Sequence, residues 1–557
     1  ANTANWIGKY SSAWSDVFNW EANVKPDASR DIVMRNGSPY LARVSDSAEV
    51  RNITLSGAAN AVLISLDSNA VFRVNGTLTK NNGYIDASSG IFCLNGSNSQ
   101  SVPANLFLDN KVVNLEIGNS SLSGVALLGT LDVYQTLNFS TSGYKLNTNG
   151  NLTLKSTENA TASVGNLTGK IINGDVTVER YIPTGLTHAK SWQFLSVPVN
   201  GSQTINQAWQ DSATSFNQNR YPGFGTTITS NLGTNTAGCN ALGFDFFTPA
   251  GGTLKTYSAT DSSWVGVSST LIPIANKKGY FVFVRGDRSV ITSTAAPVPT
   301  VLRAKGKLYT ATSGELPPIT TVAANRFESV GNPYASAIDF RNINRPNNTV
   351  DNTFYVWDPL LAGSYNLGGF QTISSVNGYR PIPGGTANYN SAIPCTTIQS
   401  GQAFFVHATG ANSGGAISFS ESAKTLGSKT TFRNENGSTP QSFISTFLYT
   451  YTGINDKMAD GNYIVMDENE NNGYDSHDAL KLLNSGENFG INTCSKKLTL
   501  ESRSMPLAGD TFHFVMSNLK KQNYQLRIAA VGLINNEYTA VLLDKYNGIE
   551  TIISNVD

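Results

Sequence analysis

The sequence is poor in charge, and neither sign is in excess. Charged residues make up 14% of the 557 residues, against roughly 25% in an average soluble protein. The 39 Lys and Arg residues balance the 39 Asp and Glu residues. A neutral chain offers no basic field for nucleic acid and no polybasic segment for anionic lipid. We therefore expect no nucleic-acid partner.

Long apolar runs and closely spaced cysteines are also missing. No run reaches the ~18 apolar residues of a membrane-spanning helix, so we expect no membrane span. The cysteines are Cys93, Cys239, Cys395 and Cys494, and the absence of a CxxC pair argues against zinc and thioredoxin-type chemistry. We predict buried free thiols, with a Cys239–Cys395 disulfide as the alternative. The N-terminal ANTANW is typical of a mature end left by signal-peptide cleavage.

Motifs for catalysis are absent as well. The four histidines, His188, His407, His477 and His513, are far apart in the sequence. No HExxH, GxSxG, P-loop or Rossmann fingerprint occurs. We therefore expect no catalytic residues, no organic cofactor and a protein that is not an enzyme. A polysaccharide-degrading β-helix enzyme is the alternative, because some β-helices carry catalytic carboxylates along one face.

The chain is instead rich in Asn, Ser, Thr and glycine (50 glycines), which favours strands and tight turns over helices. Between residues 51 and 185, short alternating strands such as AVFRVNGTLT and KLNTNGNLTLK recur. This spacing predicts stacked coils of a parallel β-helix-like solenoid; a β-sandwich is the alternative. Residues 1–50 hold Trp6, Trp14 and Trp20. We predict that they form an N-terminal cap, with a sugar-binding aromatic platform as the alternative.

Two later stretches resemble each other. SWQFLSVPV leads to KKGYFVFVRGD (Lys277–Asp287), and RFESVGNPY leads to QSGQAFFVHATG (Gln399–Gly410). Both combine alternating aromatic and β-branched strands with long polar loops, which is typical of β-sandwiches. The fold prediction is therefore all-β, a solenoid followed by sandwich modules. The predicted modules are a first copy (186–300), a second copy (301–425) and a C-terminal sandwich (426–557).

The segment DENENNGYDSHD is the densest acidic stretch. It places Asp467, Asn469, Asn471 and Asp475 at alternating positions around a glycine. Calcium prefers six to eight oxygen ligands, so these four residues are candidate calcium ligands. The alternative is a solvated turn held by Asx hydrogen bonds.

Aromatic residues in the long loops are candidate sugar-stacking positions, with anchoring of the loops as the alternative. They are Tyr221, Phe224, Tyr365, Tyr379 and Tyr389.

Several motifs together resemble one class of exported protein. The run GDVTVERYIP leads into SWQFLSVPV, SVGNPYASAIDF follows, and DENENNGYDSHDALKLLN precedes KKLTLESRSMPL and KYNGIETIIS. Over residues 100–557 this pattern is similar to secreted surface proteins of Bacteroidota exported by the type IX secretion system. Such cargo continues into a C-terminal sorting domain, whereas this chain stops at ISNVD; we expect that the domain was cleaved off or left out.

The resemblance implies export by the type IX machinery and a place outside the cell or on its outer surface. It implies adhesive or gliding-associated roles, with surface polysaccharide or other surface proteins as partners. Ser47 and Ser212 lie in Asp-Ser-Ala triplets that resemble O-glycan acceptors of this group. We predict a non-catalytic surface adhesin or self-assembling fibre subunit; a carbohydrate-binding module array is the alternative.

Overall fold

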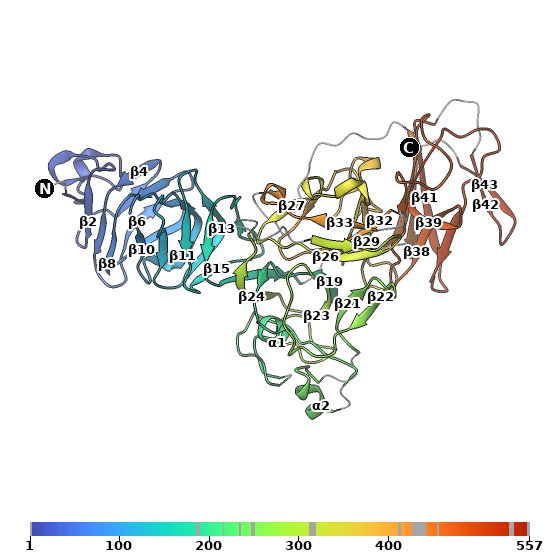
Figure 1. The fold of residues 1–557 in the computed structure, drawn as a ribbon, viewed down its shortest axis with the longest axis horizontal. Coiled ribbons are helices and arrows are strands. Elements are labelled where there is room, and N and C mark those ends of the chain that lie inside the picture. The colour runs from blue at the N-terminus through green and yellow to red at the C-terminus, as the bar shows by residue number, and fades with distance from the viewer. Residues whose placement is uncertain are drawn as a thin grey trace.

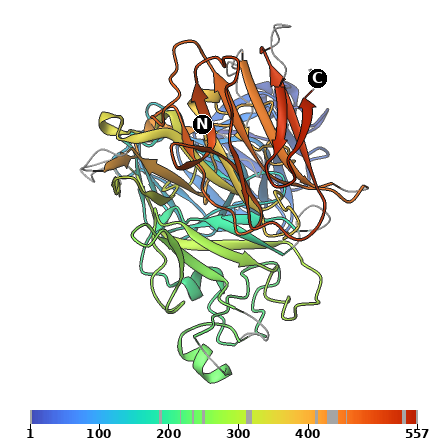
Figure 2. The same cartoon turned by 90° about the vertical axis from the view of Figure 1, so that its right-hand side faces the viewer.

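The protein is almost entirely β-structure. The computed structural model describes residues 3–184, 190–215, 217–232, 235–246, 251–310, 319–409, 414–425, 442–453, 456–533 and 540–553. Within these ranges the only α-helices are α1 (Ile205–Trp209) and α2 (Thr236–Ala241). The predicted all-β class is therefore confirmed. The chain extends along one long axis, and a lobe containing both helices projects to one side of it (Figures 1 and 2).

The N-terminal part is a parallel β-solenoid of about six turns, as predicted. Every neighbouring pair within its two short ladders is parallel, which is the arrangement of stacked coils. One ladder contains β1 (Thr3–Asn5), β2 (Asp31–Arg35), β5 (Ile53–Ser56) and β8 (Leu78–Asn82). The other contains β10 (Gln100–Val102), β12 (Val125–Leu127), β14 (Lys145–Asn147) and β17 (Ile171–Asn173).

A longer sheet forms the remaining wall of the solenoid. Its strands are β3 (Ala42–Val44), β4 (Ser47–Val50), β6 (Val62–Leu66), β7 (Val71–Val74), β9 (Tyr84–Leu94), β11 (Phe107–Ile117), β13 (Leu131–Phe139), β15 (Leu152–Leu154), β16 (Ser163–Val164) and β18 (Val176–Ile182). Alternate side chains along each strand point inward. The aligned residues Leu94, Ile117 and Phe139 show how the coils stack, because each pairs with its counterpart in the next coil.

The tryptophan-rich segment closes the first coil. Trp6, Trp14 and Trp20 are all buried. The Trp14 ring centroid lies 5.2 Å from that of Phe72, and Phe72 lies 5.8 Å from Phe92, so aromatic contacts continue from the cap into the solenoid core. The cap prediction holds for these residues. The sugar-platform alternative is wrong, because buried rings offer no face to a sugar.

The solenoid begins earlier than the sequence predicted. Strands β2, β3 and β4 lie within the range assigned to the cap, yet they pair in parallel with β5, β6 and β7 of the next coil. Alternating side chains in these strands already supply core residues such as Ile32 and Val44. The cap is therefore the segment between β1 and β2, and it is not the whole range 1–50.

An antiparallel strand from beyond the first copy closes the other end of the solenoid. Strand β24 (Thr300–Leu308) pairs with β18 over seven residues, from Val176↔Gly306 to Ile182↔Thr300. Its far edge pairs with β20 (Val199–Asn200). Without β24, the open edge of β18 would expose unpaired backbone N–H and C=O groups. The solenoid sheet thus continues by hydrogen bonds into the following modules.

The two resembling stretches form sheets with the same strand order. In the first copy the order is β19 (Ser191–Leu195), β23 (Tyr280–Val284), β21 (Leu254–Ser258) and β22 (Ser263–Gly266). In the second copy it is β26 (Phe327–Gly331), β32 (Ala403–Ala408), β28 (Val350–Asp358), β29 (Gly369–Ser374) and β30 (Pro381–Ile382). In both, the opening strand pairs antiparallel with the closing strand. The aromatic hydrophobic patterns therefore mark equivalent strands.

The second-copy sheet is buried on both faces. Successive residues of β32 point to opposite faces: Phe405 stacks on Phe194 of the first copy at 5.0 Å, while Phe404 packs with Phe354 and Phe340. The two copies therefore share one sandwich core, and the second copy has a further core on its other face.

That further core is completed by short strands of the second copy. These are β27 (Ala337–Asp339), β31 (Thr397–Ile398) and β34 (Lys424–Thr425) in one sheet, with β25 (Ile319–Val322) and β33 (Gly415–Ser418) in another.

The C-terminal module is a separate seven-stranded sheet. Residues 426–441, where the sequence placed its beginning, lie outside the described residues. Its strands are β35 (Ser442–Thr450), β36 (Met458–Met466), β37 (Ala479–Leu480), β38 (Asn488–Thr493), β39 (Lys496–Arg503), β40 (Phe514–Ser517) and β41 (Tyr524–Val531). A two-stranded hairpin, β42 (Ala540–Asp544) and β43 (Ile549–Ile553), follows at the far end of the long axis (Figure 1).

None of the four cysteines is in a disulfide bond. Cys93, Cys239 and Cys395 are buried, as predicted, and the alternative Cys239–Cys395 bridge is not formed. Cys494 is exposed, contrary to the prediction, because it lies with positive φ in the turn between β38 and β39. No helix in the described ranges is long and apolar enough to cross a membrane.

Candidate functional site

The most promising site is a polar hollow of about 280 Å³ beside helix α1, at the side of the solenoid's last coil. We call it the α1 hollow. Its lining residues come from β18, the residue before the N-cap of α1, α1 itself, the loop that follows α1, and β24. They are Thr177, Gln203, Gln207, Asp211, Ser212, Arg220, Tyr221, Arg303, Ala304 and Lys305.

Local sequence features position these walls. Thr204 is the N-cap of helix α1. Its hydroxyl accepts from the Gln207 backbone N–H, and the Gln207 side-chain oxygen accepts from the Thr204 backbone N–H, so a capping box fixes this end. On β24, Leu302 and Ala304 are buried against the core. Their neighbours Arg303 and Lys305 therefore emerge together on the opposite face of the strand, toward the hollow.

Arg303 is the central charged group of the α1 hollow. Its Nε donates to Asp211 Oδ1 at 2.8 Å. Its guanidinium carbon lies 4.3 Å from the Phe224 ring centroid and 4.9 Å from that of Tyr221. Burial raises the pKa of Asp211, and the hydrogen bond and charge of Arg303 oppose that rise. The ion pair with Asp211 thus holds the Arg303 guanidinium in place against the Phe224 and Tyr221 rings.

A buried ion pair holds the long loop that forms the outer wall. Arg288 Nη1 and Nη2 donate to Asp245 at 2.9 and 2.7 Å, and both side chains are almost fully buried. Arg288 also donates to the carbonyls of Ser215, Gln218 and Thr226. One guanidinium therefore joins three parts of the loop.

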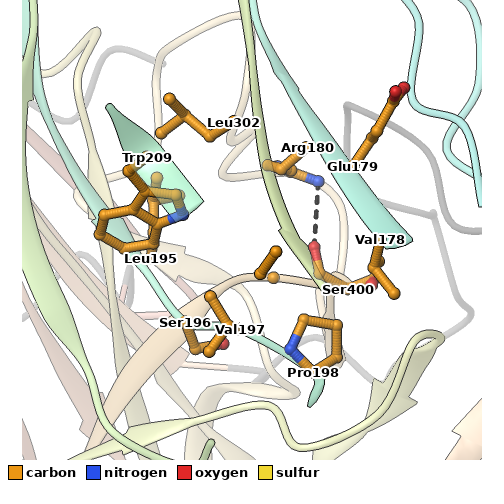
Figure 3. A pocket seen from close by; sticks show the side chains of 12 residues that line it. Val178, Glu179, Arg180, Leu195, Ser196, Val197, Pro198, Trp209, Leu302 and Ser400 are labelled. Carbon is orange, nitrogen blue, oxygen red and sulfur yellow. Dashed lines mark hydrogen bonds between the residues drawn. The ribbon is translucent and has the colours of Figure 1, made fainter. Parts of the chain in front are cut away.

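The junction beneath the hollow is a packed region. Figure 3 shows Arg180 of β18 reaching toward Ser400, with Trp209 and Leu302 on the opposite side. Arg180 Nη1 donates to Ser400 O at 3.3 Å, and burial lowers the pKa of Arg180 to about 10. The enclosed space is about 10 Å³, which suffices for about one water molecule. This junction therefore links the solenoid to the second copy and leaves no room for a ligand.

The four candidate calcium ligands form two separate turn pairs. Asp467 Oδ1 accepts from both the backbone N–H and the side chain of Asn469. Asn471 Nδ2 donates to Asp475 Oδ2 at 2.6 Å. These are the Asx hydrogen bonds of the alternative interpretation.

A different triad lies close together in the same turn. Glu470, Asp475 and His477 place their ligand atoms within 4.8 Å of one another. His477 Nδ1 is hydrogen-bonded to Glu470 at 2.9 Å, which raises the pKa of His477. Glu470 and His477 were not among the predicted ligands, although both lie in the acidic segment DENENNGYDSHD. His477 adds a nitrogen ligand atom that the predicted oxygen set did not contain.

The two candidate glycosylation sites differ in access. Ser47 is exposed at the start of β4, where its hydroxyl accepts from Arg73 Nη1 at 3.0 Å. Ser212 is half-buried and lies in the α1 hollow, next to the buried Asp211. A glycan on Ser212 would fill the hollow, whereas one on Ser47 would extend into solvent.

Only one of the five loop aromatics is exposed. Tyr221 keeps 47% of its surface and lies at the rim of the α1 hollow. Tyr389 is buried, and Tyr379 packs against the second-copy core. Tyr365 contacts Lys520 at 4.3 Å. The prediction of sugar-stacking residues is therefore wrong for Tyr389, whose ring no ligand can reach.

The comparison with known protein families identifies the C-terminal part of the chain. A family model described as a domain of unknown function (DUF8693) matches residues 244–556, more than half of the chain. The chain belongs to this family. The DUF8693 match covers β21 to β43 and leaves out the solenoid and α1. No curated protein and no solved structure matches the chain.

Proposed function

We propose that this chain is an extracellular structural or adhesive protein without catalytic activity, exported by type IX secretion and held at or released from the outer cell surface. The motifs that resemble type IX cargo support the export route. The DUF8693 match is compatible with this role and assigns no activity of its own.

The observation that carries the proposal is the β18–β24 seam. Seven consecutive residue pairs join the solenoid to the modules that follow, and Phe194 and Phe405 join the two copies. A continuous hydrogen-bonded sheet with shared cores resists bending, as a scaffold that spans distance needs to do. Stacked repeats of this kind present long outer surfaces to partners.

Adhesion can be measured directly. Beads coated with the full chain are passed in flow over surfaces carrying different polysaccharides or outer-surface protein extracts, with albumin-coated beads as the control. The proposal predicts retention on at least one surface and no shortening of the polymers. Retention equal to that of albumin on every surface, or depolymerisation of a polysaccharide, would contradict it.

A carbohydrate-binding role is the second candidate, favoured by the exposed Tyr221 at the rim of a polar hollow. Flat aromatic rings beside hydrogen-bonding groups suit sugar recognition. Glycan-array binding that is lost in Tyr221→Ser would support this role.

Assembly into fibres is the third candidate function. Electron micrographs of the purified chain test it by showing either filaments or single particles.

The acidic turn is a proposed cation site, with calcium as the first ion to test. Calorimetry with calcium and a melting experiment with chelator decide the question. Heat of binding together with a lower melting temperature in chelator supports a cation; no heat and no shift leave the turn held by its own Asx hydrogen bonds.

A further inference from the structure

We propose that the α1 hollow binds an anionic sugar unit of an acidic polysaccharide. The inference deepens the proposed adhesive function, on which it rests, by naming the chemistry of what is held. Three features of the hollow carry it: its charge, its unused donors and its size.

The hollow concentrates positive charge in a chain that has no net charge. Three cationic side chains, Arg220, Arg303 and Lys305, line it together with one carboxylate, Asp211, giving a formal net charge of +2. Asp211 already accepts from Arg303 Nε and is only 5% exposed. The carboxylate is therefore withdrawn from solvent, while Arg220 and Lys305 are exposed. An approaching ligand meets the cations first.

Arg303 retains donors for a ligand. Its terminal Nη atoms make no hydrogen bond with any residue of the described ranges. Its Nε is fixed by Asp211, and its flat face lies over Phe224 at 4.3 Å. A guanidinium held in place presents a planar fork that matches a carboxylate or sulfate group. Because the fork is already ordered, little rotamer entropy is lost on binding.

The rest of the lining suits a sugar ring. Tyr221 offers a partly exposed aromatic side chain at the rim, and Gln203, Gln207 and Thr177 offer polar groups. A volume of about 280 Å³ lies at the lower end of ligand pockets. One or two sugar units fit this size better than a folded partner does.

Nucleic acid fits the same charges less well. Binding a phosphate backbone needs several contacts along a groove or stripe. The positive charge here is confined to one hollow, and the chain as a whole is neutral. An oligonucleotide is therefore a control ligand in the experiment, and binding as tight as that of the acidic sugar would contradict the assignment.

The test is calorimetric titration of the full chain with tetragalacturonate, a neutral galactose tetramer and a sulfated galactose tetramer. Salt is held at about 20 mM, where the Debye length is roughly 20 Å. The double variant Arg220→Gln/Lys305→Gln removes two cations and leaves the Arg303–Asp211 pair intact. The matched control is Lys307→Gln, since Lys307 is exposed on the same strand but outside the hollow.

We expect at least one of the two acidic tetramers to bind, and the neutral one to bind at least about tenfold more weakly. Preference between the acidic tetramers shows whether carboxylate or sulfate is the ligand group. The double variant should lose about tenfold or more in affinity, and Lys307→Gln clearly less, because Lys307 does not line the hollow and acts on a ligand there only at long range.

Equal affinity of the double variant, or no binding of either acidic tetramer, overturns the proposal. The adhesive function is then judged separately in the bead assay. If beads carrying the double variant are retained as well as wild-type beads, the hollow is not the adhesive site and the adhesive function stands. If wild-type beads are not retained on any surface, the function itself fails.

Discussion

Replacing Arg288 by methionine should destabilise the first copy by several kilocalories per mole. The substitution leaves Asp245 buried without its cation, which costs about 3–5 kcal/mol in comparable cases. It also removes donors from the carbonyls of Ser215, Gln218 and Thr226, each worth roughly 1 kcal/mol net. Both effects act in the same direction, so we expect a loss of at least about 3 kcal/mol.

Native-state hydrogen exchange of β21 and β23 amides against urea measures this loss in one module. The double variant Arg288→Met/Asp245→Asn should be less destabilised than Arg288→Met, because it buries no unpaired charge while the Ile228 N–H keeps an acceptor. The control is Arg43→Met, whose ion pair with Asp67 is exposed and should contribute less than about 1 kcal/mol. A loss in Arg288→Met no larger than in Arg43→Met would show that the buried ion pair stabilises the protein no more than an exposed one.

Three further predictions concern the N-terminal cap, the C-terminal module and the cysteines. Trp14→Ala should lower the free energy of unfolding of the solenoid by about 3–5 kcal/mol, measured by urea melting; a loss below about 1 kcal/mol would contradict the capping role. Burial raises the pKa of Asp478 to about 6, so the folded C-terminal module keeps a proton that the unfolded chain loses near pH 4. Its stability should therefore fall as pH rises from about 4 to 6, and less so in Asp478→Asn; equal slopes would count against this. Finally, a thiol reagent should label only Cys494 in the native protein, since the other three cysteines are buried; rapid labelling of more than one thiol would contradict the fold.

The sequence was sufficient for the features that repeat. Alternating strands at regular intervals predicted the solenoid, because coils that cannot bury their own inner face must stack. The two aromatic strand pairs predicted equivalent elements, and β19–β23 and β26–β32 are paired in the same way. Local patterns of this kind need no knowledge of distant contacts.

Features made by distant segments could not be predicted. Asp211 and Arg303 are 92 residues apart, and nothing in either neighbourhood indicates that they meet. Strand β24 ends the solenoid although it follows the whole first copy in sequence. Phe404 and Phe405 were correctly placed in a strand, but only the packed structure shows that they serve two different cores. The acidic turn was found from local composition, while its triad depended on how the turn folds.

Hydrogen exchange at the β18–β24 seam shows whether the solenoid and the following modules form one stiff scaffold. If the solenoid and the modules form one stiff scaffold, the β24 amides that face β18 should exchange as slowly as those of the interior solenoid strand β13. In an antiparallel pair these are alternate residues; the amides of Val301 and Lys305 donate away from the seam and are not counted. Exchange of the β18-facing amides within seconds, while β13 stays protected, would show a hinge at the seam in place of a stiff scaffold.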